Sequence, residues 1–212
     1  MSTFSNAQGK AILLKMVKAI QDNKAYLGEV DGLIGDGDHG MNMNKGFTLF
    51  ENRFADKDFG FSEGLYELGT ILFSEIGGSM GPIYGTILMD MSSAGEDLDE
   101  ISLKDLGDML SAGLEGLTEI VDAKVGDKTL VDTLSPAVDS LKSSAESGKD
   151  FKEALVDMKK SAVDGRDSTK DMVAKFGRSS RLGERSRGVL DAGATSCCII
   201  LEAMADGIME LL

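Results

Sequence analysis

The stretch that decides the fold runs from Leu106 to Val121 and reads LGDMLSAGLEGLTEIV. Its large apolar residues recur every three or four positions, at Leu106, Leu110, Leu114, Leu117 and Val121. An α-helix turns once every 3.6 residues, so this spacing places all of them on one face. The stretch therefore predicts a helix whose apolar face is buried against other helices.

The same spacing recurs along most of the chain. The stripes are Leu13, Met16, Val17 and Ile20; Phe47, Phe50 and Phe54; Leu65, Leu68, Leu72 and Ile76; Phe151, Leu155 and Met158, running on toward Met172 and Val173; and Ile200, Met204, Ile208 and Leu211. Further helices are expected from about Ile83 and about Leu130. Two prolines in 212 residues and the lack of strict alternation argue against a sheet. We therefore expect an all-α bundle of eight helices.

Composition limits the possible functions. The 212 residues fit one domain, residues 1–212, and 42% apolar with 27% charged residues is typical of a folded soluble protein. A formal net charge of -14 argues against binding to nucleic acid or to an anionic membrane. No signal pattern or membrane-spanning apolar run is evident, so we expect a cytoplasmic protein. The adjacent Cys197 and Cys198 are typical of core residues.

The chain has 26 glycines, and many of them gather where helices should meet. The densest groups precede the second, fourth and eighth expected helices. In an up-and-down bundle alternate loops lie at the same end. Glycine also permits a close approach of the backbone to a ligand. These groups therefore predict one composite site at one end of the bundle.

The first group is the acidic stretch from Asp31 to Asn42, DGLIGDGDHGMN, which carries Asp31, Asp36 and Asp38. Three neighbouring carboxylates repel one another unless a cation or several backbone donors neutralise them. A calcium-binding hand is excluded, because Gly40 and Phe47 stand where oxygen ligands belong. The stretch favours Mg²⁺ and phosphate, and a capped acidic turn at a helix start is the alternative.

His39, the single histidine, follows Asp38 directly. It could be a metal ligand, a hydrogen-bond donor to phosphate or an ordinary loop residue, and its place beside Asp38 favours phosphate contact. Gly35, Gly37 and Gly40 also match Gly-x-Gly-x-x-Gly, but no strand precedes them. A dinucleotide-binding fold is therefore rejected.

Two further groups are suited to anions. Residues 77–82, GGSMGP, precede a helix and could present backbone N–H groups to a phosphate; an ordinary loop with capping glycines is the alternative. Between Lys175 and Gly193, five basic residues fall within 13 positions, which favours phosphate binding over a solvated loop. Gly126–Thr129, GDKT, is not a Walker A loop, because Val121 stands where its first glycine should be.

Together these groups predict a site for magnesium and a nucleotide polyphosphate. No Ser-His-acid triad can be built around the one histidine, so covalent catalysis is not indicated. Phosphoryl transfer needs mainly positioning and charge neutralisation, which these residues supply.

The motifs resemble, in order and spacing, those of the L subunits of dihydroxyacetone kinases. The stretches that carry the resemblance are Gly35–Met43, Gly77–Gly85, Gly126–Thr129, Gly177–Ser186 and Asp191–Ala194. The resemblance implies an eight-helix antiparallel up-and-down barrel with a nucleotide at one end. It also implies that two Mg²⁺ ions are held by Asp31, Asp36 and Asp38.

By the same resemblance, nucleotide contacts fall to a set of residues from all of the loops. They are His39, Gly40, Met41, Asn42, Ser79, Met80, Leu130, Arg178, Asp191, Ala192 and Gly193. The catalytic groups implied are Asp36, Asp38 and Arg178. The chain departs from the family pattern at Met80, Val121, Arg181, Arg187 and Ala192, where nucleotide or partner preference can differ.

The implied function is to hold Mg-ADP or Mg-ATP and to pass the terminal phosphoryl group to a ketose on a separate K subunit. In the phosphotransferase-dependent form, bound ADP is rephosphorylated by a phosphohistidine on an M subunit. Two alternatives remain. One is a nucleotide-dependent protein that binds a transcription regulator without catalysing. The other is a stand-alone metal-dependent phosphohydrolase or a helical metal-binding module.

Overall fold

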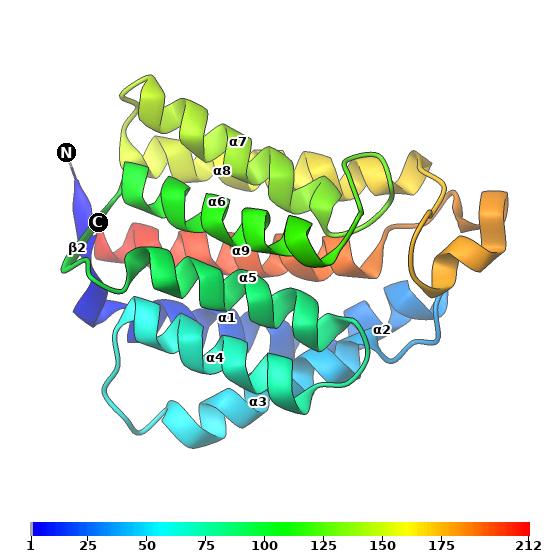
Figure 1. Ribbon diagram of the computed structural model, residues 1–212, viewed down its shortest axis with the longest axis horizontal. Coiled ribbons are helices and arrows are strands. Elements are labelled where there is room, and N and C mark those ends of the chain that lie inside the picture. The colour runs from blue at the N-terminus through cyan, green and yellow to red at the C-terminus, as the bar shows by residue number, and fades with distance from the viewer. Residues whose placement is uncertain (1) are drawn as a thin grey trace.

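The computed structural model describes residues 2–212, and within them the chain forms nine α-helices (Figure 1). They are α1 (Lys10–Asp22), α2 (Lys24–Gly32), α3 (His39–Phe54), α4 (Phe61–Glu75), α5 (Met80–Gly95), α6 (Leu103–Ile120), α7 (Val131–Glu146), α8 (Phe151–Ser168) and α9 (Ala192–Leu211). Short 3-10 helices span Asn6–Gln8, Thr169–Asp171 and Arg178–Ser186. The expected all-α class is confirmed.

The helix that raises the count from eight to nine is α2, which follows α1 after a single residue, Asn23. Asn23 has a φ of -99° and a ψ of 7°, outside helical geometry, and its backbone N–H and side-chain amide both donate to the Ala19 carbonyl, at 3.2 and 2.8 Å. The chain bends there and starts again as α2. The apolar stripe ending at Ile20 therefore marks α1 alone.

A small antiparallel ribbon is the exception to the helical fold. Strand β1 (Thr3–Ser5) pairs with β2 (Glu100–Ser102), with Phe4 opposite Ile101. Phe4 is buried, and its ring packs edge-on against Phe61 with centroids 5.5 Å apart. Three residues are too few to produce a detectable alternating pattern. The ribbon covers one end of the bundle.

The core is formed mainly by the predicted stripes, and Leu106, Leu110 and Leu117 of α6 are at most 1% exposed. Four stripe residues are only partly buried and pack against this core, namely Phe54, Leu114, Val121 and Leu211. The expected continuation of the Phe151 stripe toward Met172 and Val173 is wrong, because α8 ends at Ser168 and a short 3-10 helix follows.

Helix α9 contacts α1, α7 and α8, and Cys197 and Cys198 are buried in it. Within residues 2–212 it is the one helix long and apolar enough to cross a membrane, but 72% of its most apolar window is buried. That burial is what a central helix of a bundle requires.

The loops that precede α3, α5 and α9 lie at the same end of the bundle, the right-hand end in Figure 1. The connection between α6 and α7 also reaches this end, and the β1–β2 ribbon lies at the other end. The antiparallel succession of the helices produces this arrangement, because each long helix returns the chain to the opposite end. The glycine-rich and charged loops thus meet, although far apart in sequence.

Candidate functional site

A cavity of about 470 Å³ opens between these loops. Its volume lies in the usual range of small-molecule sites. Most of the site residues predicted from the sequence line it, namely Asp31, Asp36, Asp38, His39, Asn42, Ser79, Met80, Leu130, Arg178, Asp191, Ala192 and Gly193. The exceptions are Gly40 and Met41.

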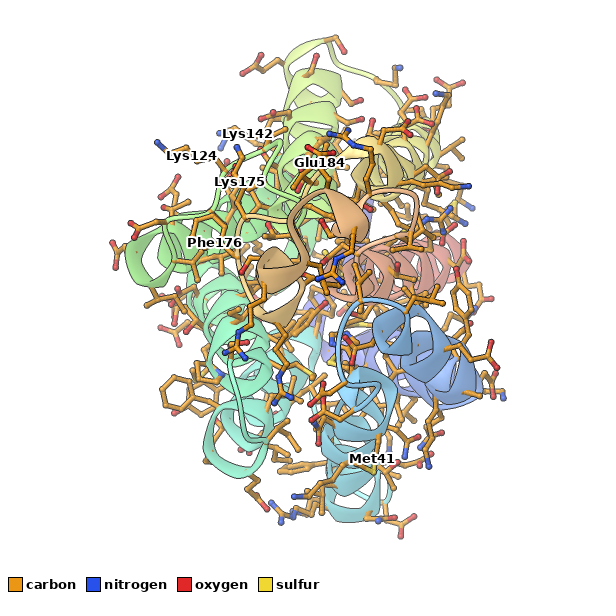
Figure 2. All side chains as sticks on the ribbon, turned by 90° about the vertical axis from the view of Figure 1, so that its right-hand side faces the viewer. Met41, Lys124, Lys142, Lys175, Phe176 and Glu184 are labelled. Atoms are coloured by element: carbon orange, nitrogen blue, oxygen red, sulfur yellow. The ribbon has the colours of Figure 1, made fainter. Side chains whose placement is uncertain are left out.

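Gly40 and Met41 occupy other surroundings. A Cβ at Gly40 would lie 2.1 Å from the Lys24 carbonyl oxygen, so glycine there allows α3 to pack directly on α2. The Met41 side chain is exposed, and Figure 2, which looks onto this end of the molecule, shows it well apart from Phe176 at the cavity. The structure therefore gives Gly40 a packing role and leaves Met41 outside the cavity.

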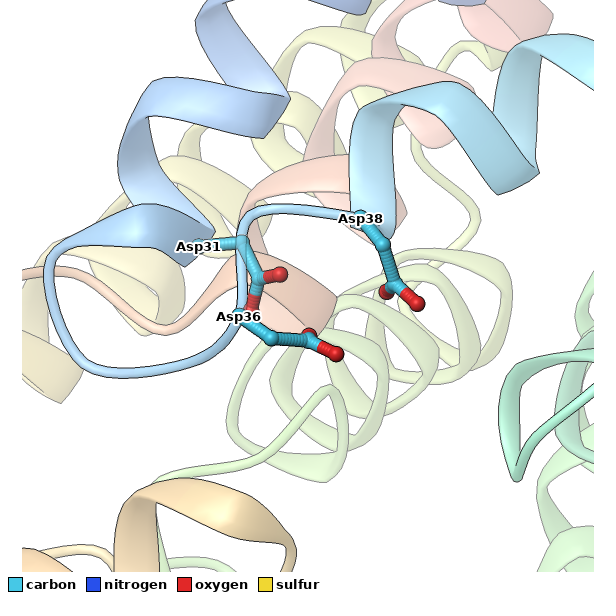
Figure 3. Close-up of side chains that lie close together, drawn as sticks. All are labelled: Asp31, Asp36 and Asp38. Carbon is cyan, nitrogen blue, oxygen red and sulfur yellow. The ribbon is translucent and has the colours of Figure 1, made fainter.

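Three carboxylates converge on one side of the cavity (Figure 3). Asp31 lies in the last turn of α2, Asp36 in the following loop and Asp38 immediately before α3, and one oxygen from each lies within 4.8 Å of the others. Gly35 makes this possible, because a Cβ there would lie 2.2 Å from Asp31 Oδ1. Gly37 turns the loop at a φ of 78°.

The donor set of this cluster fits a hard divalent cation. It is made only of carboxylate oxygens, which Mg²⁺ prefers, and three negative charges at this separation repel one another unless they are neutralised. The alternative of a capped helix start is weakened, because the Asp38 side chain makes no capping hydrogen bond to α3. Asp31 Oδ2 accepts a bond of 3.3 Å from the backbone N–H of His39.

His39 begins α3, and its imidazole is part of a buried hydrogen-bonded chain. Its Nε2 lies 2.7 Å from Ser196 Oγ, which lies 2.6 Å from the Tyr84 hydroxyl, and Tyr84 donates to the Gly193 carbonyl at 3.1 Å. Burial lowers the pKa of His39 to about 4, despite the opposing effect of Asp31. A neutral His39 at pH 7 is a hydrogen-bonding group and not a cation.

Sequence reasoning missed Tyr84 and Ser196. Both lie inside otherwise apolar helices, α5 and α9, and both are buried. A hydroxyl within an apolar helix needs a hydrogen-bond partner once the helix is buried, so the position of these two hydroxyls in the sequence was the available signal. Without the contacts between these helices, that signal does not identify the partner.

The glycine-rich loop leads into α5 from the opposite side of the cavity. A Cβ placed on Gly77 or Gly78 would meet nothing within 4 Å, so the backbone here is open to the cavity. Gly78 has a φ of 75°, and Ser79 occupies the N-cap position of α5. Backbone N–H groups at a helix start carry a partial positive charge and suit an anion.

Residues 169–191, which we name the arginine loop, close the third side. Phe176, Gly177, Arg178 and Ser179 line the cavity, whereas Arg181 does not. The Arg178 guanidinium donates to the Asp36 carboxylate, which links this loop to the acidic cluster. Figure 2 shows Phe176 and Lys175 near one edge of this end of the molecule. Arginine at this position can bind phosphate oxygens through two parallel hydrogen bonds.

Asp191 ends the arginine loop and starts α9. Its Oδ2 accepts a hydrogen bond of 2.7 Å from the Ala194 backbone, so it caps the helix. Burial raises the pKa of Asp191 to about 6, although that hydrogen bond and the charge of Lys128 act in the opposite direction. Ala192 and Gly193 follow in the first turn, where their backbone lies at the cavity.

Comparison with known proteins identifies relatives of this chain. A family model for the DAK2 domain matches residues 33–206. The ADP-binding subunit DhaL of PEP-dependent dihydroxyacetone kinase from Escherichia coli is 38% identical over 85% of this chain and 86% of its own length. The corresponding subunit of kinase 1 from Listeria innocua is 36% identical over 87% of this chain and 88% of its own.

A solved structure shares the fold. The dihydroxyacetone kinase of C. freundii, in complex with AMP-PNP and Mg²⁺, superposes with a TM-score of 0.70 at 19% identity. The match covers 97% of this chain and 35% of that longer chain. Given the extent of the family match and the identity to full-length relatives, the chain belongs to the DAK2 domain family and is a homologue of the ADP-binding subunits of dihydroxyacetone kinase.

Proposed function

We propose that this chain is the nucleotide-binding subunit of a dihydroxyacetone (ketose) kinase, in which residues 1–212 act as one domain in the cytoplasm. It holds ADP or ATP with magnesium and passes the terminal phosphoryl group to a ketose on a separate K subunit. The observation that carries this proposal is the convergence of the acidic cluster, the glycine-rich loop and Arg178 around one cavity. The names of the relatives, ADP-binding subunits of a kinase, support it.

The metal-binding residues in this proposal are Asp31, Asp36 and Asp38, and the number of ions expected is two. Magnesium, when bound there, neutralises charge on the phosphate oxygens. The three carboxylates also fix where that charge is neutralised, because Asp31 and Asp38 are anchored at the ends of α2 and α3. The C. freundii kinase, solved with AMP-PNP and Mg²⁺, supports a magnesium-nucleotide as the ligand.

The other residues bind and orient the phosphates. The open backbone at Gly77 and Gly78 and the N-terminus of α5 offer N–H donors, and neutral His39 offers a ring N–H. The Arg178 guanidinium stabilises negative charge that develops on the transferred group. We assign catalytic roles to Asp36, Asp38 and Arg178. Nucleotide contacts are proposed for the other predicted residues that line the cavity, which are His39, Asn42, Ser79, Met80, Leu130, Asp191, Ala192 and Gly193.

The phosphoryl donor is proposed to be a phosphohistidine on an M subunit, with ADP retained as a cofactor. Two relatives are named PEP-dependent kinases, which favours this form over exchange with free ATP. A nucleotide-dependent contact with a transcription regulator is the alternative role, and it needs no turnover.

Mass spectrometry of the protein as isolated tests the cofactor mode, which predicts co-purifying ADP. Reconstitution tests the reaction. The chain is mixed with a K-type partner and dihydroxyacetone, and with either ATP or a phosphorylated M-type partner, and sugar phosphate is measured. Product from either donor supports the kinase role. No product from any combination, together with tight nucleotide retention and binding to a regulator, would favour the alternative.

A further inference from the structure

Lys128 is a buried lysine for which the site described above gives no role. It lies in the turn between α6 and α7, is 1% exposed and lines the cavity. It is also the one non-glycine residue in residues 2–212 with a positive φ, 62°. A buried ammonium and a left-handed backbone at a residue with a side chain are both unfavourable. A position that combines them calls for a compensating function.

The contacts of the ammonium lie at the two ends of the arginine loop. Lys128 Nζ donates to the Thr169 carbonyl, where the loop leaves α8, and to the Val189 carbonyl, shortly before α9. The backbone N–H of Asp191 also donates to Thr169 Oγ1 at 3.0 Å. One side chain thus bridges both ends of the loop. Beside it, the Thr169 hydroxyl and a backbone hydrogen bond of 2.7 Å from Gly188 N–H to the Lys170 carbonyl join the same two ends.

The turn that carries Lys128 is itself held in place. Asp132, 1% exposed in the first turn of α7, accepts hydrogen bonds from Gly126 N–H at 2.5 Å and Thr129 N–H at 2.8 Å. The Asp127 carbonyl accepts a bond of 3.1 Å from the Lys175 backbone, within the arginine loop. The ammonium is therefore fixed relative to α7 rather than carried by the loop that it holds.

The far part of the same loop reaches across the cavity, where Arg178 donates to Asp36. Between its base and Arg178 the loop is also joined to the α6–α7 turn, because the backbone N–H and the ammonium of Lys175 both bond to Asp127. That turn also carries Lys128, so losing the ammonium at the base loosens the turn-side anchorage of the whole loop. We propose that Lys128 is a positioning residue for phosphoryl transfer, whose ammonium closes the base of the arginine loop and so holds Arg178 over the cavity. This role rests on the proposed function, and Lys128 acts through Arg178.

Hydrogen exchange of the nucleotide-free protein tests the closure of the loop directly. In Lys128→Met, amides of residues 170–188 should exchange about tenfold faster or more, while those of α4 and α5 keep their protection. Lys170→Met is the matched control, because it removes an exposed ammonium at the same loop base. Unchanged exchange in Lys128→Met, or equal acceleration in both variants, would overturn the proposal.

A double-mutant cycle on Mg-ADP affinity tests whether Lys128 acts through Arg178. As a single substitution, Lys128→Met should weaken Mg-ADP binding about tenfold. Added to a chain that already carries Arg178→Ala, it should weaken binding less than about twofold. A general loss of stability would instead lower affinity equally in both backgrounds, and that result would contradict the positioning role. If the unmodified chain binds no Mg-ADP, the proposed function fails, whereas the exchange data still decide whether Lys128 closes the loop.

Lys128→Gly provides a second variant in case Lys128→Met does not fold. Glycine adopts a positive φ without strain, so this change removes the ammonium and relieves the backbone together. We expect a folded protein with a rapidly exchanging arginine loop. If both Lys128 variants fail to fold while Lys170→Met folds, Lys128 serves the stability of the whole chain and the proposal is wrong.

Discussion

Arg178 and Asp36 are hydrogen-bonded to each other although 142 residues separate them in the sequence. The Arg178 side chain is 66% exposed and that of Asp36 is 35% exposed. An ion pair this open to water adds little to the stability of the fold. The two side chains can therefore give up this ion pair at little cost in stability. Arg178 can then bind a phosphate and Asp36 a metal ion.

Substitution of Arg178 should separate nucleotide binding from other functions of the arginine loop. Arg178→Ala should weaken Mg-ADP binding about 10- to 100-fold, because charge-assisted hydrogen bonds contribute about 1.5–3 kcal/mol. Arg181→Ala, on the same loop but outside the cavity, should leave nucleotide affinity unchanged and weaken docking of a partner subunit. Isothermal titration with Mg-ADP measures nucleotide affinity in both variants. Equal losses of nucleotide affinity in the two variants would contradict this division of roles.

The acidic cluster should be needed for metal and nucleotide together. Asp36→Ala or Asp38→Ala should abolish Mg-dependent ADP binding, because magnesium bridges the carboxylates and the phosphates. Without metal, the melting temperature should stay the same or rise, since like-charge repulsion is reduced. The ADP-induced rise in melting temperature should disappear.

The control for the acidic cluster is Asp108→Ala. Asp108 is an exposed carboxylate that pairs with Lys104 near the start of α6, at the opposite end of the bundle. It should retain the full ADP-induced rise in melting temperature. Nucleotide affinity that survives in Asp36→Ala or Asp38→Ala would show that metal and nucleotide do not share a site.

Two glycines around the start of α5, Gly77 in the glycine-rich loop and Gly81 in the first turn of the helix, should respond differently to substitution by alanine. A Cβ at Gly81 would lie 2.2 Å from the Ile76 carbonyl oxygen, so Gly81→Ala should lower the free energy of unfolding by about 2 kcal/mol. A Cβ at Gly77 meets nothing, so Gly77→Ala should change stability by less than about 0.5 kcal/mol and still weaken Mg-ADP binding. Urea unfolding and titration measure the two effects. Full nucleotide affinity in Gly77→Ala would rule out a close approach of phosphate to that backbone.

The single histidine allows a direct test of the buried site. In the metal-free protein the His39 ring should titrate with a pKa of about 4, since burial disfavours its charged form. The folded state then binds fewer protons than the unfolded state between pH 6.5 and 4. The free energy of unfolding should therefore decrease as the pH is lowered through this window, by up to about 1.4 kcal/mol per pH unit. Imidazole NMR signals report the pKa, and a midpoint near 6.5 would place His39 in water.

The sequence predicted the helices with long apolar stripes and the three loops of the site, because both depend on local spacing. The stripe on α6 and the acidic stretch from Asp31 to Asn42 are examples. It did not predict α2 as a separate helix, because the break lies in the backbone conformation of one residue, Asn23, and leaves no mark on the apolar spacing. It also missed the β1–β2 ribbon, which joins residues nearly 100 positions apart through only three pairs.

The details of the site required the fold. Lys128 stands in a polar turn typical of a solvated loop, and its burial arises only when the base of the arginine loop packs over it. The motif around Gly40 predicts a contact with the nucleotide, whereas a Cβ at this position would meet the backbone of α2. Such contacts between elements distant in sequence leave no periodic trace.

Helix α9 carries the chain from the cavity to the far end of the bundle, where its last turn lies near β1 (Figure 1). Its 20 residues span about 30 Å at 1.5 Å each. An affinity handle or fluorophore attached after Leu212 therefore stays a full helix length from the mouth of the cavity. The protein can be immobilised on a sensor surface by this end, with the mouth facing solution and open to both a nucleotide and a second protein.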